Sequence, residues 1–313
     1  MNIVVDINNN ENGTQNVVQG IKVFMQKAKN ITVYAIGSEK DLATLKGMKN
    51  VELIYAKKGY EGKVDITNKE ISLTKAFDLL SNKNKKIDAL VSSADRSVLK
   101  KYSEKYLEKV EKEPVFLATY PDAYTGKQTL LLDFGYNYNA TAETLVEQFE
   151  IAKRFATSVL QKKDPKYKVL SYTLDEDEQS QVIKNLDKKF KNDKAYEGII
   201  TSYNVLRSET DILIGQPELV STVSNSINEA ITVYDDYIDK ARSLSWLYNI
   251  NLRLCKRIFS DFHKSIDKKV SAGGVALIGF SKIVVQSNPT TTVAGVNGAL
   301  EFAKKIARSY KSK

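Results

Sequence analysis

One short segment of the sequence places an acidic residue, a glycine and an amide directly after a run of apolar residues. Thr129–Leu132 has the composition of a buried strand, and Asp133, Gly135 and Asn137 follow it in quick succession. Side chains at the carboxyl end of a central strand in an α/β protein converge on a crevice shared with neighbouring loops, and glycine lets the backbone approach a ligand. The sequence therefore predicts a ligand site here; the alternative is a strand-to-helix turn with a polar cap.

Apolar, β-branched segments alternate with amphipathic helical segments along most of the chain. Strands are predicted at residues 3–5, 31–34, 51–55, 87–91, 115–118, 130–132, 169–172, 199–201 and 212–214, and helices at 14–28, 73–82, 143–160, 177–190 and 292–310. Repeated strand-then-helix order indicates a mostly parallel sheet covered by helices on both faces. We therefore expect a three-layer α/β/α fold that spans residues 1–313 as a single domain.

Residues 217–270 interrupt this alternation with helical periodicity and without a strand. We expect two helices, at 218–241 and 252–268, joined by an apolar tip at 244–250 that holds the only tryptophan of the sequence. The tip residues are Leu244, Trp246, Leu247 and Ile250, and lysines and arginines flank them. Aromatic and leucine side chains ringed by cations are typical of contacts with an anionic membrane surface. The alternatives are packing against a second subunit or against the protein's own core.

The composition limits the classes of function. A chain of 313 residues with 42% hydrophobic content can bury a substantial core, and no apolar run approaches the roughly 20 residues that span a bilayer. The opening MNIVVDINNN lacks the layout of a secretory signal, so we expect a cytoplasmic protein. A single cysteine, Cys255, and a single histidine, His263, leave little for a metal site or a cysteine nucleophile. The formal charge of +9 indicates an acidic partner, a nucleic acid, an anionic membrane or simple solubility.

Four segments, in matching order, resemble motifs of the PlsX phosphate acyltransferases of phospholipid synthesis. The family's DAMGGD, VSAGNTGAL, LLDVGAN and GGAPLLG correspond to residues 6–11, 91–99, 131–137 and 273–279 of this chain. The helical pair with its apolar tip also falls where the family has one. The resemblance covers nearly the whole chain and implies the isocitrate and isopropylmalate dehydrogenase-like fold, which is related to that of the phosphotransacetylases.

The resemblance also implies an activity and partners. Family members join inorganic phosphate to an acyl chain carried on acyl carrier protein, which gives acyl phosphate, and they require no metal or cofactor. The implied protein is a homodimer that associates peripherally with an anionic membrane through the hairpin tip. A basic surface suits the acidic carrier protein, whereas nothing in the sequence resembles a nucleic-acid recognition module.

The resemblance implies a set of site residues that is incomplete relative to the family pattern. The catalytic candidates are Asp133, Asn137 and Asp6, and the phosphate-binding candidates are Ser92, Lys69, Ser72, Arg96, Asn288 and Thr290. Several glycines of the family motifs are replaced. The segment GNTGA reads Ala94–Val98 here, which places a carboxylate near the expected phosphate, and the family's HGSS has lost its histidine. Arg96 is expected either to bind phosphate as a fork or to pair with Asp95.

Three hypotheses of function remain open at this point. The first is a phosphate acyltransferase that works with a substituted site. The second is a catalytically degenerate relative that acts as a scaffold for a membrane or for the carrier protein. The third is a short-chain phosphate acyltransferase that uses acyl-coenzyme A, because phosphotransacetylases share the general architecture.

Overall fold

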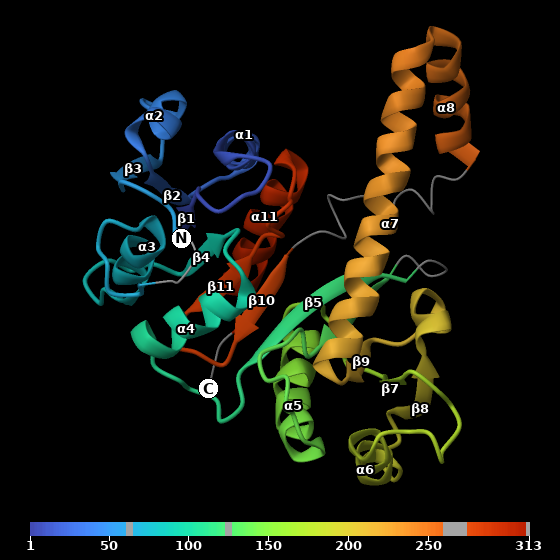
Figure 1. Cartoon of the computed structure of the whole chain (residues 1–313). Helices are drawn as coiled ribbons and strands as arrows, with labels where there is room; N and C mark the ends of the chain where they lie inside the picture. The colour runs from blue at the N-terminus through green and yellow to red at the C-terminus, as the bar shows by residue number, and fades with distance from the viewer. Residues whose placement is uncertain (61–64, 123–126, 259–273, 311–313) are drawn as a thin grey trace.

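A computed structural model describes residues 1–60, 65–122, 127–258 and 274–310 (Figure 1). The strands are β1 (Asn2–Asp6), β2 (Thr32–Gly37), β3 (Val51–Tyr55), β4 (Ala89–Ser92), β5 (Val115–Pro121), β6 (Gln128–Leu132), β7 (Tyr167–Ser171), β8 (Tyr196–Thr201), β9 (Ile212–Gly215), β10 (Val275–Ile278) and β11 (Ile283–Gln286). The helices are α1 (Thr14–Lys27), α2 (Glu39–Leu42), α3 (Ser72–Ser81), α4 (Arg96–Tyr106), α5 (Ala142–Ser158), α6 (Gln181–Phe190), α7 (Pro217–Leu244), α8 (Trp246–Ile258) and α11 (Val293–Ser309), with short 3₁₀ turns at Ala43–Leu45 and Ser202–Arg207.

The described strands form one eleven-stranded sheet in the order β3-β2-β1-β4-β11-β10-β5-β6-β9-β7-β8. Neighbours are parallel from β3 to β11 and again from β6 to β8, whereas β10 is antiparallel to β11 and β5, and β5 is antiparallel to β6. The sheet is therefore mostly parallel, as predicted. The two parallel groups run in opposite directions, which the sequence did not indicate.

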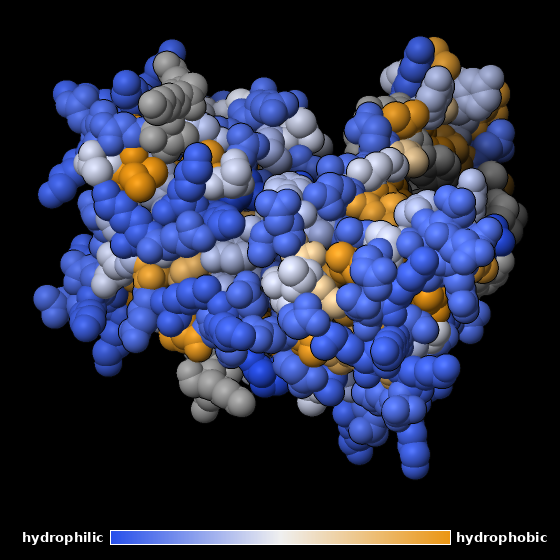
Figure 2. All heavy atoms as spheres, turned by 60° about the horizontal axis from the view of Figure 1, so that its bottom comes forward, coloured by the Kyte–Doolittle hydropathy of each residue, from blue (hydrophilic) through white to orange (hydrophobic). Residues whose placement is uncertain are grey.

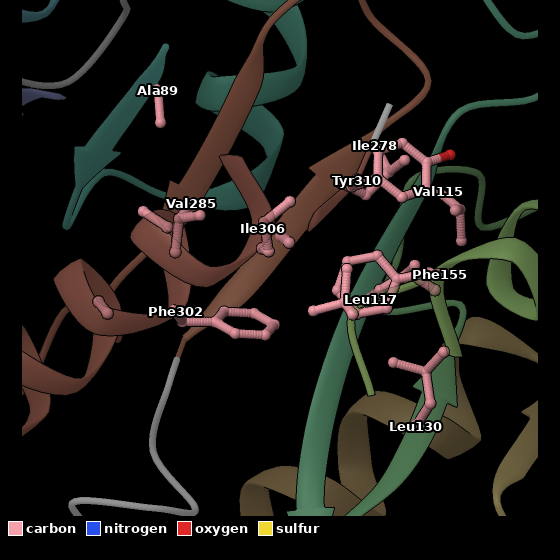
Figure 3. Packing of buried hydrophobic residues seen from close by; sticks show 14 of the residues in the cluster. Ala89, Val115, Leu117, Leu130, Phe155, Ile278, Val285, Phe302, Ile306 and Tyr310 are labelled. Atoms are coloured by element: carbon pink, nitrogen blue, oxygen red, sulfur yellow. The ribbon is translucent and has the colours of Figure 1, made fainter. Parts of the chain in front are cut away.

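Helices cover both faces of the sheet and give the predicted three layers. On one face α1, α11, α5 and α6 enclose the larger apolar core, and on the other α3, α4 and the first part of α7 enclose a second one. In Figure 3, Phe302 and Ile306 of α11 point toward Leu117 of β5 and Phe155 of α5. Each fully buried side chain of this size contributes about 1.5–3 kcal/mol to stability, so the two cores fix the positions of the strand ends.

Beyond its first turns α7 runs away from the sheet, and α8 lies against its outer part (Figure 1). Pro217 occupies the first turn of α7, where its missing N–H group is not needed. The second helix begins at Trp246 and not near residue 252, so Trp246, Leu247 and Ile250 lie in the first turns of α8 instead of in a connecting loop. The remainder of the predicted second helix, beyond Ile258, and His263 lie outside the described residues.

The tip of this hairpin is apolar and exposed. Trp246 is 69% exposed, and Leu244, Leu247 and Ile250 are exposed as well. Figure 2 shows hydrophobic side chains on this projection at the upper right of the molecule. The tip therefore does not pack against the described core. In the part of the chain that the structure describes, no helix combines the length and the apolar character needed to cross a bilayer.

Candidate functional site

The carboxyl ends of three neighbouring parallel strands bring polar side chains together. Asp6 ends β1, Ser92 ends β4 and Gln286 ends β11, and these residues are paired in register across the sheet. The hydroxyl of Ser92 donates a hydrogen bond to Oδ2 of Asp6 at 3.0 Å, and the backbone N–H of Asn8 donates to Oδ1 at 3.2 Å. The sequence prediction that Asp6 and Ser92 share a site is consistent with this arrangement.

The carboxyl group of Asp6 is fully buried. Burial raises its pKa to about 6, although the nearby Ser72 hydroxyl and the hydrogen bonds from Asn8 and Ser92 act in the opposite direction. Near neutral pH this group is close to its titration range, in which it can exchange a proton with a bound oxyanion.

Three buried polar atoms in the loop after β1 and at the start of α3 have no hydrogen-bond partner within the described structure. They are Nδ2 of Asn8, Oδ1 of Asn9 and Oγ of Ser72. The Ser72 hydroxyl is near enough to the Asp6 carboxylate to lower its pKa, but the geometry does not form a regular hydrogen bond. Buried polar groups without partners are rare in folded proteins, so these atoms indicate a place for a ligand or water. We call Asp6, Asn8, Asn9, Ser72 and Ser92 the cradle.

Local sequence explains how the cradle forms. Asn9 has a left-handed backbone with φ of 64°, a conformation that asparagine tolerates better than most residues. Asparagine thus supplies a positive-φ backbone in this loop, where the family motif has glycines. Ser72 is the first residue of α3, and its backbone N–H donates to the carbonyl of Lys58 at 2.9 Å. The amino end of a helix carries partial positive charge, so the hydroxyl of Ser72 lies where an anion is favoured.

The loop before α11 is hydrogen-bonded to the loop after β1. The side chain of Asn12 donates to the carbonyl of Thr290 at 2.5 Å, and the backbone of Glu11 donates to that of Pro289 at 2.8 Å. Oδ1 of Asn288 accepts hydrogen bonds from the backbone and the hydroxyl of Thr290. Both predicted phosphate-binding side chains of this loop are thus exposed and bonded to each other.

The end of β6 holds a second buried carboxylate, Asp133. Its donors are the backbone N–H groups of Phe116, Tyr136 and Asn137 and the side-chain amide of Gln148, at 3.0–3.2 Å. Burial raises the pKa of Asp133 to about 6 against these hydrogen bonds. The carboxylate oxygens are occupied by the protein's own loop, so this residue organises residues 133–137.

The two other residues of the opening motif also shape this loop. Oδ1 of Asn137 accepts a hydrogen bond from the backbone of Asn139 at 3.1 Å. Gly135 has φ of +93°, and a Cβ atom on it would approach the hydroxyl of Tyr138 to 2.6 Å. Only glycine fits this position without strain, so the loop depends on it.

The cradle and Asp133 are too far apart to contact one phosphate. Five strand steps separate β1 from β6, so at about 4.8 Å per step the strands of Asp6 and Asp133 lie about 24 Å apart. The predicted site residues therefore divide into two groups. Asp6, Ser72 and Ser92 come together, whereas Asp133 and Asn137 lie at the end of a strand from the oppositely directed group.

Arg96, at the start of α4, lies between these groups. Its guanidinium carbon is 5.5 Å from the centre of the Phe134 ring, and the side chain is half-buried. Within the described ranges it makes no ion pair with Asp95, which was one of the two expectations for this residue. The predicted candidate Lys69 is exposed on the turn before α3.

Helix α4 fastens the Asp133 loop through its next turns. Nζ of Lys100 donates to the carbonyl of Tyr136 at 2.7 Å and lies 4.5 Å from the centre of its ring. The hydroxyl of Tyr136 donates to Glu104 at 3.1 Å. Arg96, Lys100 and Glu104 are spaced four residues apart, which places them on one face of the helix. This face was not predicted from the sequence, although the i, i+4, i+8 spacing of its residues is a usable signal.

Asn8, Asn9 and Tyr60 were also overlooked as individual site residues. Tyr60 follows β3 and reaches the cradle through tertiary contacts, for which the sequence offers no signal.

Two cavities of the described structure lie away from both regions. One, of about 400 Å³, is lined by the β10–β11 turn, and the other, of about 670 Å³, by α5, the loop before β7 and the end of α11. Neither contains a predicted site residue. No cluster of three potential metal-ligating side chains occurs among the residues that the structure describes.

Comparison with solved structures agrees with the observed fold. A branched-chain phosphotransacylase from Enterococcus faecalis matches 99% of this chain and 100% of its own with a TM-score of 0.61 at 15% identity. A phosphotransacetylase from Streptococcus pyogenes matches 98% and 94% with a TM-score of 0.55 at 11% identity. At these identities the likeness establishes the fold alone, and it confirms the predicted fold class.

Comparison of sequences gives the family. The chain is 24% identical to the phosphate acyltransferase of Mycoplasmopsis pulmonis over 316 residues, which covers 97% of this chain and 94% of the relative. It is 23% identical to the phosphate acyltransferase of Campylobacter hominis, with 98% and 94% covered. The sequence model described as fatty acid synthesis protein matches residues 1–312. The chain therefore belongs to the PlsX family of fatty acid synthesis proteins.

Proposed function

We propose that this protein is a phosphate acyltransferase that interconverts acyl-[acyl carrier protein] and inorganic phosphate with acyl phosphate. Family membership over the full length and relatives named phosphate acyltransferase support the reaction class. The observation that carries the proposal is the set of unpartnered buried atoms of Asn8, Asn9 and Ser72 beside Asp6. Oxygen atoms of a phosphate, partly protonated near neutral pH, supply both the acceptors and the donor that these atoms lack.

The cradle residues have distinct roles in this proposal. The Ser72 hydroxyl and the Asn8 amide donate hydrogen bonds to phosphate at the positive end of α3. Asp6 takes the proton of the attacking phosphate oxygen, which its pKa of about 6 permits. The phosphate oxygen then attacks the thioester carbonyl, and the carrier thiolate leaves and is protonated. Ser92 holds Asp6 in place through its hydrogen bond.

The remaining predicted residues contribute from outside the cradle. Arg96 is a half-buried cation without an ion pair in the described structure, so its charge is available to an anionic ligand. Lys69, Asn288 and Thr290 supply charge and polar groups at the rim. For Asp133 we propose a positioning role, in which it holds Asn137 and the loop that α4 fastens, instead of the catalytic role expected from the sequence.

A matched pair of serines tests the proposal. Ser72 and Ser103 are both fully buried, and both hydroxyls lack a partner in the described structure, but Ser103 lies within α4 and is not a cradle residue. We expect Ser72→Ala to lower the rate of acyl phosphate formation from acyl-[acyl carrier protein] by roughly tenfold or more, because a donor to an anion is lost. Ser103→Ala should retain the rate. The proposal fails if the wild-type protein forms no acyl phosphate in either direction.

A scaffold function is the second candidate, and the exposed tip is the observation that favours it. Such a protein would bind the membrane or the carrier protein without turnover. Its net charge of +9 suits either acidic partner. A third candidate, transfer from a short acyl-coenzyme A, is separated from the first by comparing the two thioesters as substrates in the same assay.

We propose that the tip residues Leu244, Trp246, Leu247 and Ile250 contact an anionic membrane, as a peripheral association. The double change Trp246→Ser and Leu247→Ser should abolish sedimentation with vesicles that contain anionic lipid. Tyr203→Ser is the matched control, because Tyr203 is 89% exposed but lies outside the hairpin. Unchanged sedimentation of the double variant would show that the tip serves another partner.

A further inference from the structure

A short segment after β3, Lys58–Tyr60, crosses the cradle from α3 to α4, and we call it the strap. At one end the carbonyl of Lys58 accepts the hydrogen bond from Ser72 N–H at 2.9 Å. In its middle, a Cβ atom on Gly59 would lie 3.0 Å from the Cβ atom of Asn8. At the other end the carbonyl of Tyr60 accepts a hydrogen bond from Nδ2 of Asn9 at 3.0 Å. The strap thus contacts the residues that carry the unpartnered atoms.

The strap ends on a paired contact with Asp95. The Tyr60 hydroxyl donates to Oδ2 of Asp95 at 3.1 Å and accepts from the backbone N–H of Asp95, also at 3.1 Å. Burial raises the pKa of Tyr60, so the phenol stays protonated and remains a donor at neutral pH. Asp95 precedes α4, but its side chain makes no capping hydrogen bond to the helix. Its carboxylate is therefore held by the strap and not by α4.

This contact resembles the one that an oxyanion would make. A carboxylate oxygen occupies the position beside a phenol donor and the amino end of α4, where a phosphate oxygen is also favoured. A negative charge at that position repels phosphate in the neighbouring cradle. Independently of this contact, Ser72 is fully buried and its hydroxyl has no hydrogen-bond partner in the described structure, which indicates that a ligand is missing from the cradle.

We infer that Tyr60 is a phosphate-contacting residue and that the Asp95 carboxylate is an internal competitor, which holds the Tyr60 hydroxyl until phosphate binds. This inference rests on the proposed function, because it assumes that phosphate binds the cradle. When phosphate enters, the Tyr60 hydroxyl donates to it and the Asp95 side chain turns to solvent. Phosphate affinity is accordingly set by Asp95, whose carboxylate was already expected from the sequence to lie near the phosphate.

Binding of radiolabelled inorganic phosphate to the full chain, measured by equilibrium dialysis, tests the inference. Asp95→Asn keeps an acceptor for Tyr60 but removes the charge, and we expect it to lower the Kd for phosphate by roughly fivefold, the upper range for an exposed charge. Tyr60→Phe should raise the Kd by roughly tenfold, because a hydrogen bond to a charged group is lost. In the double variant the gain from Asp95→Asn should shrink, because without the Tyr60 hydroxyl the Asp95 carboxylate has no phosphate contact to compete for. Fully additive effects would contradict the competitor role.

A second tyrosine–aspartate pair provides the matched control. The Tyr196 hydroxyl donates to Oδ1 of Asp187 at 2.6 Å, between β8 and α6 and away from the cradle. Asp187→Asn and Tyr196→Phe should change the Kd less than twofold.

The outcomes separate this inference from the proposed function. Phosphate binding by the wild-type protein that neither Asp95→Asn nor Tyr60→Phe alters would overturn the role of the strap and leave the cradle intact. A higher Kd for Asp95→Asn would overturn the competitor role directly. If neither the wild type nor Asp95→Asn binds phosphate, and no acyl phosphate forms, both the proposed function and this inference are wrong.

Discussion

Asp6 and Asp133 each follow an apolar strand, each is fully buried, and burial raises the pKa of each to about 6. Their surroundings differ. Asp133 accepts hydrogen bonds from three backbone N–H groups and the amide of Gln148, all from its own part of the fold. Asp6 lies beside the three buried polar atoms of the cradle that have no partner in the described structure. The hydrogen-bonding capacity of Asp133 is thus used within the protein, whereas polar groups of the cradle around Asp6 have no partner in the described structure.

This difference shows what a sequence motif can conceal. LLLDFGYN agrees closely with the family motif, while the loop after β1 has lost both of its glycines. The better motif match is at Asp133, whose hydrogen bonds all come from the protein itself. This match is explained by structure, because a loop that depends on its own aspartate and on Gly135 tolerates little change. The poorer match retains free polar atoms. Agreement with a motif therefore measures structural constraint as well as ligand binding.

The largest effect expected from this comparison is on stability. Asp133→Ala removes the acceptor of four buried or half-buried donors, and we expect the free energy of unfolding to fall by about 3–5 kcal/mol, as for other disrupted buried hydrogen-bond networks. Urea denaturation measures this change. Asp133→Asn, which keeps one carbonyl oxygen, should cost less than half as much.

The same variants separate the two roles of Asp133. If Asp133→Ala were as stable as the wild type but inactive, Asp133 would be a catalytic group. The proposed difference in role between Asp133 and Asp6 would then be wrong. A loss of activity that merely follows the loss of stability agrees with a positioning role. Acyl phosphate formation should therefore be measured well below the melting temperature of each variant.

Much of the fold was predictable because burial leaves a periodic pattern. The strands at residues 3–5, 51–55 and 212–214 and the helix at 292–310 were located to within one or two residues, since β-branched runs and amphipathic periods are local signals. The reversal of direction at β5 and β6 was not predictable. Strand direction depends on which strands pair, and pairing is a non-local property that no short segment encodes.

The site was predictable only where the sheet itself assembles it. Asp6 and Ser92, which the family resemblance implied as site residues, are neighbours because β1 and β4 pair in register. The joint site of Asp133 and Asp6 was implied by the family resemblance, and the five strand steps between β1 and β6 separate the two residues. Tyr60 reaches the cradle through the strap, whose path is set by tertiary contacts with Asn9 and Asp95.

A smaller effect, on the pH dependence of stability, sharpens the comparison further. The folded-state pKa of about 6 exceeds the value of about 3.9 for an unfolded aspartate. The protonated form is thus favoured by folding, so each group's stabilising contribution is complete below pH 4 and is lost as the pH rises through 6. Asparagine does not titrate, so Asp6→Asn and Asp133→Asn should each escape this loss. Between pH 4 and 7 the unfolding free energy of each variant should therefore rise by about 2–3 kcal/mol relative to that of the wild type.

Phosphate distinguishes the two carboxylates in the same experiment. A bound anion disfavours the charged form of a neighbouring carboxylate, so saturating phosphate should raise the pKa of Asp6 and leave that of Asp133 unchanged. Carbon-13 NMR titration of the aspartate carboxyl groups, assigned with the two Asn variants, measures both values. Equal shifts at the two residues would mean that phosphate binds between them, near Arg96, and the division of the site into a binding cradle and a supporting loop would be wrong.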